Sequence, residues 1–360
     1  MRNLNQKNSV LALLFIAVIF IFGSCKNDED TTLKPGKGIF IVNEGGFGKN
    51  NGTISLFDPY SLTVISGLYE SANNNVGPGD IVQSMSAFDN KGFIVVNNSQ
   101  KIEVVDMSTF KKVQTISPLS YPRYVAKATS TEFYVSNGNS GDGTPGQVIV
   151  YNSNTYEVVK TITVGRGPER MLLVGNYMYV TNSGGYGTDN TVSVIDVTTK
   201  EVVKTITVGD NPVDIALDKD QNIWVFCKGK LDPNTWLPAS NSAIVKIDSK
   251  TQAVVKTFDL GQQVPSYGNN LIAMSKDGAS LYYDNGAIYK LSISATVLPT
   301  EKLINKDFYG IEVDPKNGNI LGLESSASGK GKVYFYSATD GSLVGSYTVG
   351  YNPNSAVFNY

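Results

Sequence analysis

The chain has 360 residues, 41% of them apolar, and a net charge of −2. This charge balance offers no basic surface to nucleic acid, and the lack of histidine excludes histidine-based catalytic triads and the usual zinc sites. Glycine (35 residues) and tyrosine (20 residues) are abundant, and together with many β-branched residues they favour strands joined by tight turns. We therefore expect a globular, all-β protein.

Residues 1–24 are predicted to be a targeting segment rather than part of the fold. Two basic residues precede an apolar run over residues 10–22, which is too short for a comfortable transmembrane helix. Small residues stand directly before Cys25, a pattern that resembles a bacterial lipobox, in which cleavage exposes the cysteine for lipidation. We expect Cys25 to be the lipid anchor. The alternative is an ordinary secretory signal with an incidental cysteine.

Residues 25–37 are predicted to form a flexible tether, because they are polar and contain the acidic run at 28–30. An acidic run just behind a lipidated cysteine resembles the signal that sends lipoproteins of Bacteroidota to the outer face of the outer membrane. This resemblance implies a lipid-anchored outer-membrane protein that faces the cell exterior. A plain solvated linker is the alternative.

From residue 38 onward the chain repeats itself. The string VVKTITVG stands at 158–165 and again at 202–209, and it is the best-preserved part of a longer unit. Each unit contains four runs of about five β-branched and aromatic residues, bounded by Gly, Asn, Asp and Pro, which is typical of short strands. Six units begin near Asp80, Tyr121, Gly167, Asn211, Pro265 and Asp307.

A seventh unit is divided between the two ends of the repeated region. Residues 38–69 supply three strands and lack the first, whereas residues 349–360 match a first strand, the one within 208–219. A circle of blades closed in this way leaves only short, protected sheet edges. We predict a seven-bladed β-propeller over residues 38–360, with four-stranded blades and the first blade closed by the C-terminal strand. An open solenoid is the rival arrangement.

The two faces of this propeller are expected to differ in their loops. Loops from the second to the third strand share one face, the wide face, with the connections between blades, and these loops are long and aromatic. The turns on the opposite face are short and typical of Asp-, Asn- or Ser-stabilised turns. We expect ligand binding on the wide face. The candidate residues are Phe47, Arg123, Tyr124, Arg170, Tyr186, Asp214, Trp236, Tyr267, Asn270 and Tyr309.

These candidates have structural alternatives. The aromatic rings in the loops could instead pack on their own blades. Arg123 and Arg170 could hold phosphate, carboxylate or amide groups of a ligand. Alternatively, they pair with the neighbouring acidic residues Glu169 and Asp214 and join the blades. Asparagines that close the second strands recur from unit to unit, which indicates structural turn residues. They are Asn43, Asn97, Asn137, Asn182 and Asn285.

The wide face also carries carboxylates of the kind that a calcium-dependent lactonase or a lyase would use. Glu44, Glu169 and Glu324 are expected on its loops, but their spacing matches no metal-binding motif. No nucleotide-binding loop occurs in the strand-to-helix context that it requires. We therefore predict no catalytic residue, no metal and no cofactor.

The repeated string YVTNSGG…NTVSVIDVTTKEVVKTITVGDNP resembles the YncE-like, surface-layer-type seven-bladed propellers over nearly all of residues 38–360. A narrower resemblance joins the lipobox and acidic tether to GIFIVNEGGFGKNNGTISLFDP, IVVNNSQKIEVVD and YPRYVA. Together they resemble the BtuG-like surface lipoproteins of Bacteroidota, which capture cobalamin. This resemblance implies capture of cobalamin (vitamin B12) or a related corrinoid, as a ligand rather than a cofactor, and its transfer to a TonB-dependent transporter. Capture of another nutrient, and adhesion or scaffolding at the cell surface, are the alternatives.

Overall fold

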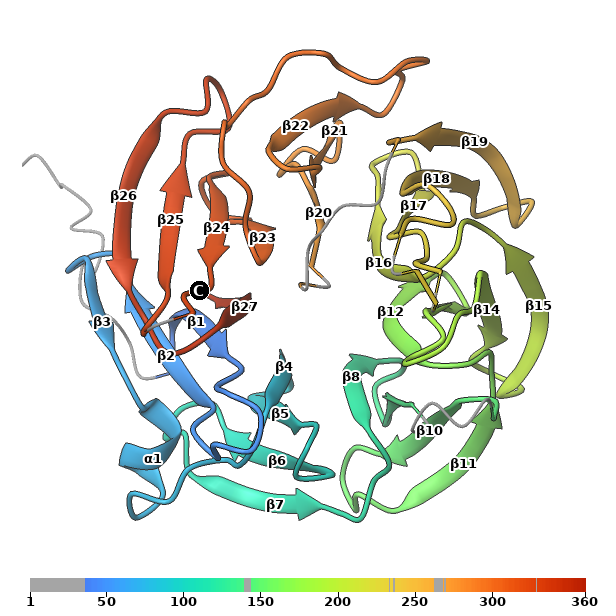
Figure 1. Ribbon diagram of the computed structural model, residues 1–360. Coiled ribbons are helices and arrows are strands. Elements are labelled where there is room, and N and C mark those ends of the chain that lie inside the picture. The colour runs from blue at the N-terminus through green and yellow to red at the C-terminus, as the bar shows by residue number, and fades with distance from the viewer. Residues whose placement is uncertain are drawn as a thin grey trace, which may run out of the picture. The chain divides into compact units, whose positions relative to one another are not determined.

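Seven small antiparallel sheets are arranged in a ring around a central axis (Figure 1). The computed structural model describes residues 36–138, 144–232, 234–235, 237–261, 268, 270–327 and 329–360. Each sheet is one blade, and the blades follow one another around the ring in chain order. The all-β class and the seven-bladed propeller predicted from the repeat are confirmed.

Blades 2 to 5 each run from an innermost to an outermost strand along the chain. Blade 2 contains β4 (Val82–Phe88), β5 (Lys91–Val96), β6 (Lys101–Asp106) and β7 (Lys112–Ile116). Blade 3 contains β8 (Pro122–Lys127), β9 (Glu132–Asn137), β10 (Gln147–Asn152) and β11 (Val158–Thr163). Blade 4 contains β12 (Pro168–Val174), β13 (Tyr177–Asn182), β14 (Thr191–Asp196) and β15 (Glu201–Thr207). Blade 5 contains β16 (Pro212–Leu217), β17 (Asn222–Cys227), β18 (Ala243–Asp248) and β19 (Ala253–Asp259).

Blade 6 departs from the predicted four strands. It contains β20 (Ile272–Met274), β21 (Ser280–Asp284) and β22 (Ile288–Ser292), and only a single bridge from Ile304 to Ile288 stands in the place of an outer strand. The preceding segment contains Pro299, which cannot donate a ladder hydrogen bond, and it lacks the β-branched run of the other outer strands. Blade 7 again has four strands. They are β23 (Gly310–Val313), β24 (Ile320–Glu324), β25 (Lys332–Tyr336) and β26 (Leu343–Thr348).

Blade 1 is built from both ends of the described chain. The C-terminal strand β27 (Pro353–Asn359) pairs antiparallel with β1 (Gly38–Asn43), in a register that sets Ile41 opposite Ala356. Strands β2 (Thr53–Asp58) and β3 (Thr63–Ile65) complete the sheet. The predicted closure of the first blade by the last strand is therefore confirmed. A five-residue helix, α1 (Leu68–Ala72), follows β3 on the way to blade 2.

The hydrophobic core lies between blades rather than within them. In β9, Phe133 and Val135 pack in a cluster shared with blade 2, whereas Tyr134 packs in a cluster shared with blade 4. Successive side chains of a strand point to opposite faces of its sheet, and both faces of a blade are covered by neighbours. This explains why the second strands are continuous apolar runs instead of alternating patterns.

The recurrent asparagines have a structural role in most blades. The Asn43 side-chain amide donates to Thr53 Oγ1 (3.2 Å) and Ser55 Oγ (3.1 Å). The Asn182 amide makes the equivalent bonds to Thr191 and Ser193 in blade 4. Asn97 is different: it lies one residue beyond the end of β5, and its amide reaches the Pro122 carbonyl of blade 3 (3.0 Å).

Both ends of the described chain lie on the face opposite the wide face. Gly36 packs against Met107, in a turn of that opposite face, and its carbonyl accepts a bond from the Asn359 side chain (2.6 Å). Lys37 Nζ donates to the carbonyl of Tyr360 (2.9 Å). The predicted signal peptide, the lipid anchor Cys25 and nearly all of the tether lie outside the described residues. No helix within the described ranges is long and apolar enough to cross a membrane.

We predict that the ring depends on the strand β27. Deletion of residues 353–360 should abolish the cooperative thermal transition, because it exposes the backbone edge of β1 and uncovers the apolar cluster between blades 7 and 1. Circular dichroism during heating measures this loss.

The matched control places residues 353–360 before residue 37 through a short linker, because Tyr360 and Lys37 are in contact. This relocated strand should restore the melting temperature of the intact protein to within a few degrees. A truncated protein that still melts cooperatively near the original temperature would contradict the role of β27.

Candidate functional site

A repeated turn leads the chain into the inner strand of five blades. The last residue of this turn has a positive φ. Its carbonyl accepts a hydrogen bond from the N–H of the residue that directly follows the second strand of the same blade. This bond holds the end of the second strand beside the start of the first, on the wide face. The turn residues are Ile81, Tyr121, Gly167, Asn211 and Asn352.

A β-bulge follows each of these turns, so that an additional residue of the inner strand lies opposite the second strand. Bulges bend a strand and redirect side chains, and they are common next to functional sites. The bulge residues lie at the wide-face end of the central channel, and we call them the mouth ring. The mouth ring consists of Gln83, Arg123, Glu169, Val213 and Asn354.

Arg123 and Glu169 form an ion pair between blades 3 and 4, with 2.9 Å between Nε and Oε2. Their side chains are only 20% and 7% exposed. Arg123 also donates to the Gln83 side chain of blade 2, and Ser183 Oγ donates to the second oxygen of Glu169 (3.3 Å). The guanidinium is therefore held between two neighbouring blades.

Arg170 and Asp214 form a second pair, between blades 4 and 5, with Nε 3.1 Å from Oδ1. The alignment is that of a charge contact rather than a hydrogen bond, since Arg170 Nε has no hydrogen-bond partner. The Arg170 guanidinium also lies 4.8 Å from the centre of the Tyr124 ring. Asp214 Oδ2 accepts bonds from the backbone of blade 6, at Leu271 (2.8 Å) and Ile272 (3.0 Å). Burial nevertheless raises the pKa of Asp214.

Polar contacts also join the remaining blades. The Asn270 amide of blade 6 donates to Glu312 Oε1 of blade 7 (2.6 Å). The Tyr309 hydroxyl of blade 7 donates to Glu44 Oε2 of blade 1 (2.9 Å). The Asn354 amide of blade 1 donates to the Gln83 carbonyl of blade 2 (2.8 Å). All seven junctions between blades are thus bridged near the channel. The structure shows the blade-joining role that was the alternative for Arg123, Arg170 and Asp214, and ligand contact by these residues stays a prediction.

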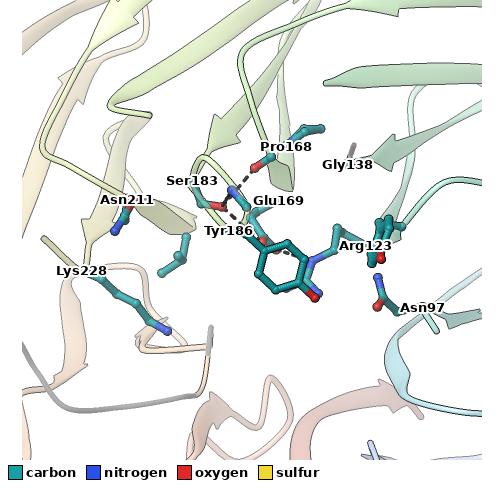
Figure 2. A pocket seen from close by; sticks show the side chains of 13 residues that line it. Asn97, Arg123, Gly138, Pro168, Glu169, Ser183, Tyr186, Asn211 and Lys228 are labelled. Carbon is teal, nitrogen blue, oxygen red and sulfur yellow. Dashed lines mark hydrogen bonds and ion pairs between the residues drawn. The ribbon is translucent and has the colours of Figure 1, made fainter. Parts of the chain in front are cut away.

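A pocket of about 240 Å³ opens on the wide face beside Arg123 and Glu169 (Figure 2). Residues of blades 2 to 5 line it. Tyr186 forms part of its wall, with a side chain 79% exposed, and its ring meets that of Tyr121 edge to face at 6.2 Å. This exposed ring does not pack into its own blade, which favours the ligand-binding interpretation of Tyr186 over the structural one.

Lys228 also lines this pocket, although it is not among the binding residues predicted from the sequence. It directly follows β17, and its N–H bonds to the carbonyl of Asn211 (3.0 Å). Burial lowers the pKa of Lys228 to about 8, against the opposing attraction of Glu169. The equivalent residues of other blades are Glu44, Asn97, Gly138 and Ser183. The repeat fixes the place of this residue in each blade, whereas the residue type differs from blade to blade. This variation is the sequence signal that could have identified Lys228.

Of the candidates Phe47, Trp236 and Tyr267, the structure describes only Phe47. Phe47 is 76% exposed in the loop after β1, which is held by a bond from the Gly48 N–H to Asp80 Oδ2 (2.9 Å). This ring stands on the wide face without lining the pocket. Trp236 and Tyr267 lie outside the described residues, so their predicted contacts are not placed.

A second cavity, of about 200 Å³, lies deeper in the channel. The inner strands line it, with Tyr124, Arg170 and Glu312 among the lining residues. Burial raises the pKa of Glu312 to about 7, although Arg170 and the Asn270 amide lower it. Arg123 and Glu169 line only the upper pocket, and Tyr124 and Arg170, which follow them in sequence, line only the lower one.

Each of the three carboxylates considered for metal-dependent catalysis is engaged by its own donors. Glu169 pairs with Arg123, and Glu324 contacts Lys306 Nζ (2.5 Å) and the Tyr334 hydroxyl (2.7 Å). Burial raises the pKa of Glu44, which accepts bonds from Asn354 and Tyr309. Within the described parts of the chain, no three or more Cys, Asp or Glu side chains gather in a group able to hold a metal ion.

Comparison with known proteins identifies a family and a common fold. The model of a family described as a domain of unknown function (DUF5074) matches residues 37–359. No curated protein matches the sequence.

Solved structures share the fold at low identity. A quinonprotein alcohol dehydrogenase-like protein of Bacteroides thetaiotaomicron is 16% identical, with a TM-score of 0.69, over 90% of this chain and 79% of that one. Kuenenia stuttgartiensis hydrazine synthase is 16% identical, with a TM-score of 0.61, over 84% and 96%. A 6-phosphogluconolactonase-like protein of Bacteroides fragilis is 10% identical, with a TM-score of 0.62, over 89% and 97%. At these identities the likeness shows the fold alone.

Arg123→Met should destabilise the protein by about 3 kcal/mol, because it leaves the Glu169 carboxylate buried without its cation. The double variant Arg123→Met/Glu169→Gln should recover part of this loss, and urea unfolding measures both. The control, Lys160→Met, removes one member of the exposed pair with Glu201 and should cost less than about 1 kcal/mol. Equal losses in Arg123→Met and the control would show that the inner pair does not hold the blades together.

The raised pKa of Glu312 predicts a pH-dependent contribution to stability. The folded protein binds the Glu312 proton more tightly than the unfolded chain does, and this difference adds to the free energy of unfolding. The gain is complete below the ordinary pKa of a glutamate and is lost as pH rises through about 7. The stability of the natural protein minus that of Glu312→Gln should therefore fall between pH 5 and pH 8, as measured by urea unfolding. The variant Glu201→Gln, which removes an exposed carboxyl group, is the matched control. A difference that rises with pH would refute the prediction.

Proposed function

We propose that this chain, which belongs to the family described as a domain of unknown function (DUF5074), captures a small-molecule nutrient on the wide face of its propeller. The ligand we propose is a corrinoid, cobalamin or a close relative. As a lipoprotein on the outer face of the outer membrane, the protein would pass this ligand to a TonB-dependent transporter. The resemblance of its motifs to the BtuG-like lipoproteins supports the choice of ligand and partner.

The observation that best supports ligand capture is the pocket on the wide face, which lies beside an exposed aromatic ring. Binding sites combine apolar and aromatic surface with a few convergent polar groups. Here Tyr186 and Tyr121 provide the aromatic surface, and Arg123, Glu169 and Lys228 provide the polar groups. Among the described residues, far more large aromatic side chains are buried than exposed, so a tyrosine that is 79% exposed beside a pocket favours an interaction with a ligand.

The size of the pocket limits how a corrinoid would bind. Pockets that enclose a drug-sized molecule have volumes of about 300–1,000 Å³, and this pocket has about 240 Å³. A corrin macrocycle would therefore lie across the mouth, against Tyr186 and the neighbouring loops. One peripheral group of the ligand would enter the pocket.

The rigidity of the mouth favours binding. The ion pairs and hydrogen bonds at the junctions hold the floor of the pocket in place before a ligand arrives. A site ordered in advance loses less conformational entropy on binding. The three carboxylates of the enzyme alternative are already engaged by cations or hydroxyl and amide donors, which supports binding rather than catalysis.

Calorimetry with cobalamin and cobinamide tests the proposal. Tight binding of either corrinoid at one site per chain is the expected result. No heat change with both would remove the corrinoid from the proposal. Calcium-dependent hydrolysis of a lactone, without corrinoid binding, would favour the enzyme alternative, and binding of a protein or glycan would favour adhesion.

Tyr186→Ala should weaken corrinoid binding at least about tenfold, because truncating an aromatic anchor costs more than about 1 kcal/mol. Its melting temperature should change little, because the ring is exposed. Tyr60→Ala, which removes a partly exposed ring on the opposite face, is the matched control and should leave affinity unchanged. Equal affinities of all three proteins would place the ligand away from Tyr186.

A further inference from the structure

The outermost strand of a blade is a sheet edge, and in most blades of this protein that strand carries a lysine. An edge presents unpaired backbone N–H and C=O groups, and a charged side chain on it opposes pairing with another chain. Among the described strands, the outermost ones of blades 2 to 6 each contain one lysine. They are Lys112 (β7), Lys160 (β11), Lys204 (β15), Lys256 (β19) and Lys290 (β22). These five edges are therefore protected by charge.

Blade 7 lacks this protection. Its outermost strand, β26, has the sequence LVGSYT, six residues without a charged side chain. Within the described part of the chain β26 pairs only with β25, so the backbone groups on its outer side face no further strand. Leu343 and Val344 are 56% and 62% exposed. β26 is thus an uncharged and partly apolar edge, the kind that pairs readily with another strand.

The neighbouring outer strand, β3 of blade 1, continues this uncharged surface. β3 contacts β26, and residues 59–69 around it contain no charged side chain. Leu62 and Ile65 are 56% and 46% exposed. Because β3 spans only three residues, its own edge is short, and β26 offers most of the backbone that a partner strand could bind.

We propose that β26 pairs antiparallel with β26 of a second copy of this chain, so that the two copies of blade 7 form one continuous sheet. In a two-fold pairing of a strand with itself, residues in the middle of the strand lie beside their own copies. A central lysine would then meet a second lysine, which is unfavourable. This conflict arises at Lys204 and Lys256, whereas β26 is complementary to itself. The proposal goes beyond ligand capture and does not depend on which ligand is bound.

The twist of the blade determines how the two copies would face. Successive strands of a sheet rotate relative to one another, and Figure 1 shows β25 and β26 running along the rim of the ring. A two-fold axis perpendicular to the sheet at this place runs along the channel axis. Both wide faces would therefore point in the same direction, as two chains anchored in one membrane by the proposed lipid require.

Sedimentation velocity of the purified protein at increasing concentration tests self-association. We expect a weak monomer–dimer equilibrium, because a six-residue edge with its side chains buries less than the roughly 1,200 Å² of a standard interface. A protein that stays monomeric up to about 1 mM, where even a millimolar dissociation constant yields dimer, would overturn the proposal.

Hydrogen exchange on the natural protein locates the contact. Amides of residues 343–348 should gain protection as the protein concentration rises, because pairing occupies the outer side of β26. Amides of residues 158–163, in the lysine-bearing edge β11, should not change. Protection that appears only outside residues 343–348 would place the contact elsewhere and refute the pairing of β26.

Val344→Lys gives β26 the charge that the other edges carry. This variant should weaken self-association at least about tenfold, because a change in a two-fold interface enters twice and brings like charges together. Its melting temperature should stay near that of the natural protein, since the side chain is exposed.

The matched control is Val255→Lys, at a position of β19 in blade 5 that is 54% exposed. It should self-associate as the natural protein does. Undiminished association of Val344→Lys, or an equal loss in both variants, would show that the two copies do not meet at β26.

Discussion

The pairing of β27 with β1 is the constraint on which the rest of the structure depends. Every apolar cluster among the described residues is shared between neighbouring blades, so in this part of the chain no blade completes its core alone. An open chain of blades would leave two sheet faces uncovered, and two strand edges inside one blade without partners. Closing the ring removes both deficits at once, because the last strand supplies the missing edge of the first blade.

The same closure fixes the polar contacts around the channel. Arg123 reaches blades 2 and 4, and the Tyr309 hydroxyl reaches Glu44, which lies 265 residues away in the chain. Buried charges need partners in good geometry, and here each partner is supplied by an adjacent blade. Arg123 and Glu169 of the mouth ring thus join blades 2, 3 and 4 and also line the pocket. The same two side chains therefore hold neighbouring blades together and set the charges at the wall of the pocket.

The sequence repeat made most of the fold predictable. The features that were not predicted lie where the sequence departs from the repeat. The second and third strands of blades 2 to 5 carry runs rich in β-branched and aromatic residues, and the recurrence of these runs allows the seven blades and the closing strand to be counted. Blade 6 departs because the segment around Pro299 lacks such a run. In the site, the sequence offered Glu169 and Asp214 as partners of Arg123 and Arg170, and the structure shows both pairs. It could not decide between this pairing and ligand contact, because both uses need the same residue types. Lys228 was missed because only its place on the scaffold, equivalent to Glu44 and Ser183, identifies it as part of the mouth.

The contact between Lys37 and Tyr360 has a practical consequence for the orientation of the molecule. The first described residues and the C-terminus lie together on the face opposite the pocket, so a tag, fluorophore or surface attached after Tyr360 leaves the mouth unobstructed. A sensor chip coated in this way would present every copy with the same face outward. Docking partners that approach along the opposite face would compete with the attachment, whereas those that approach the mouth would not.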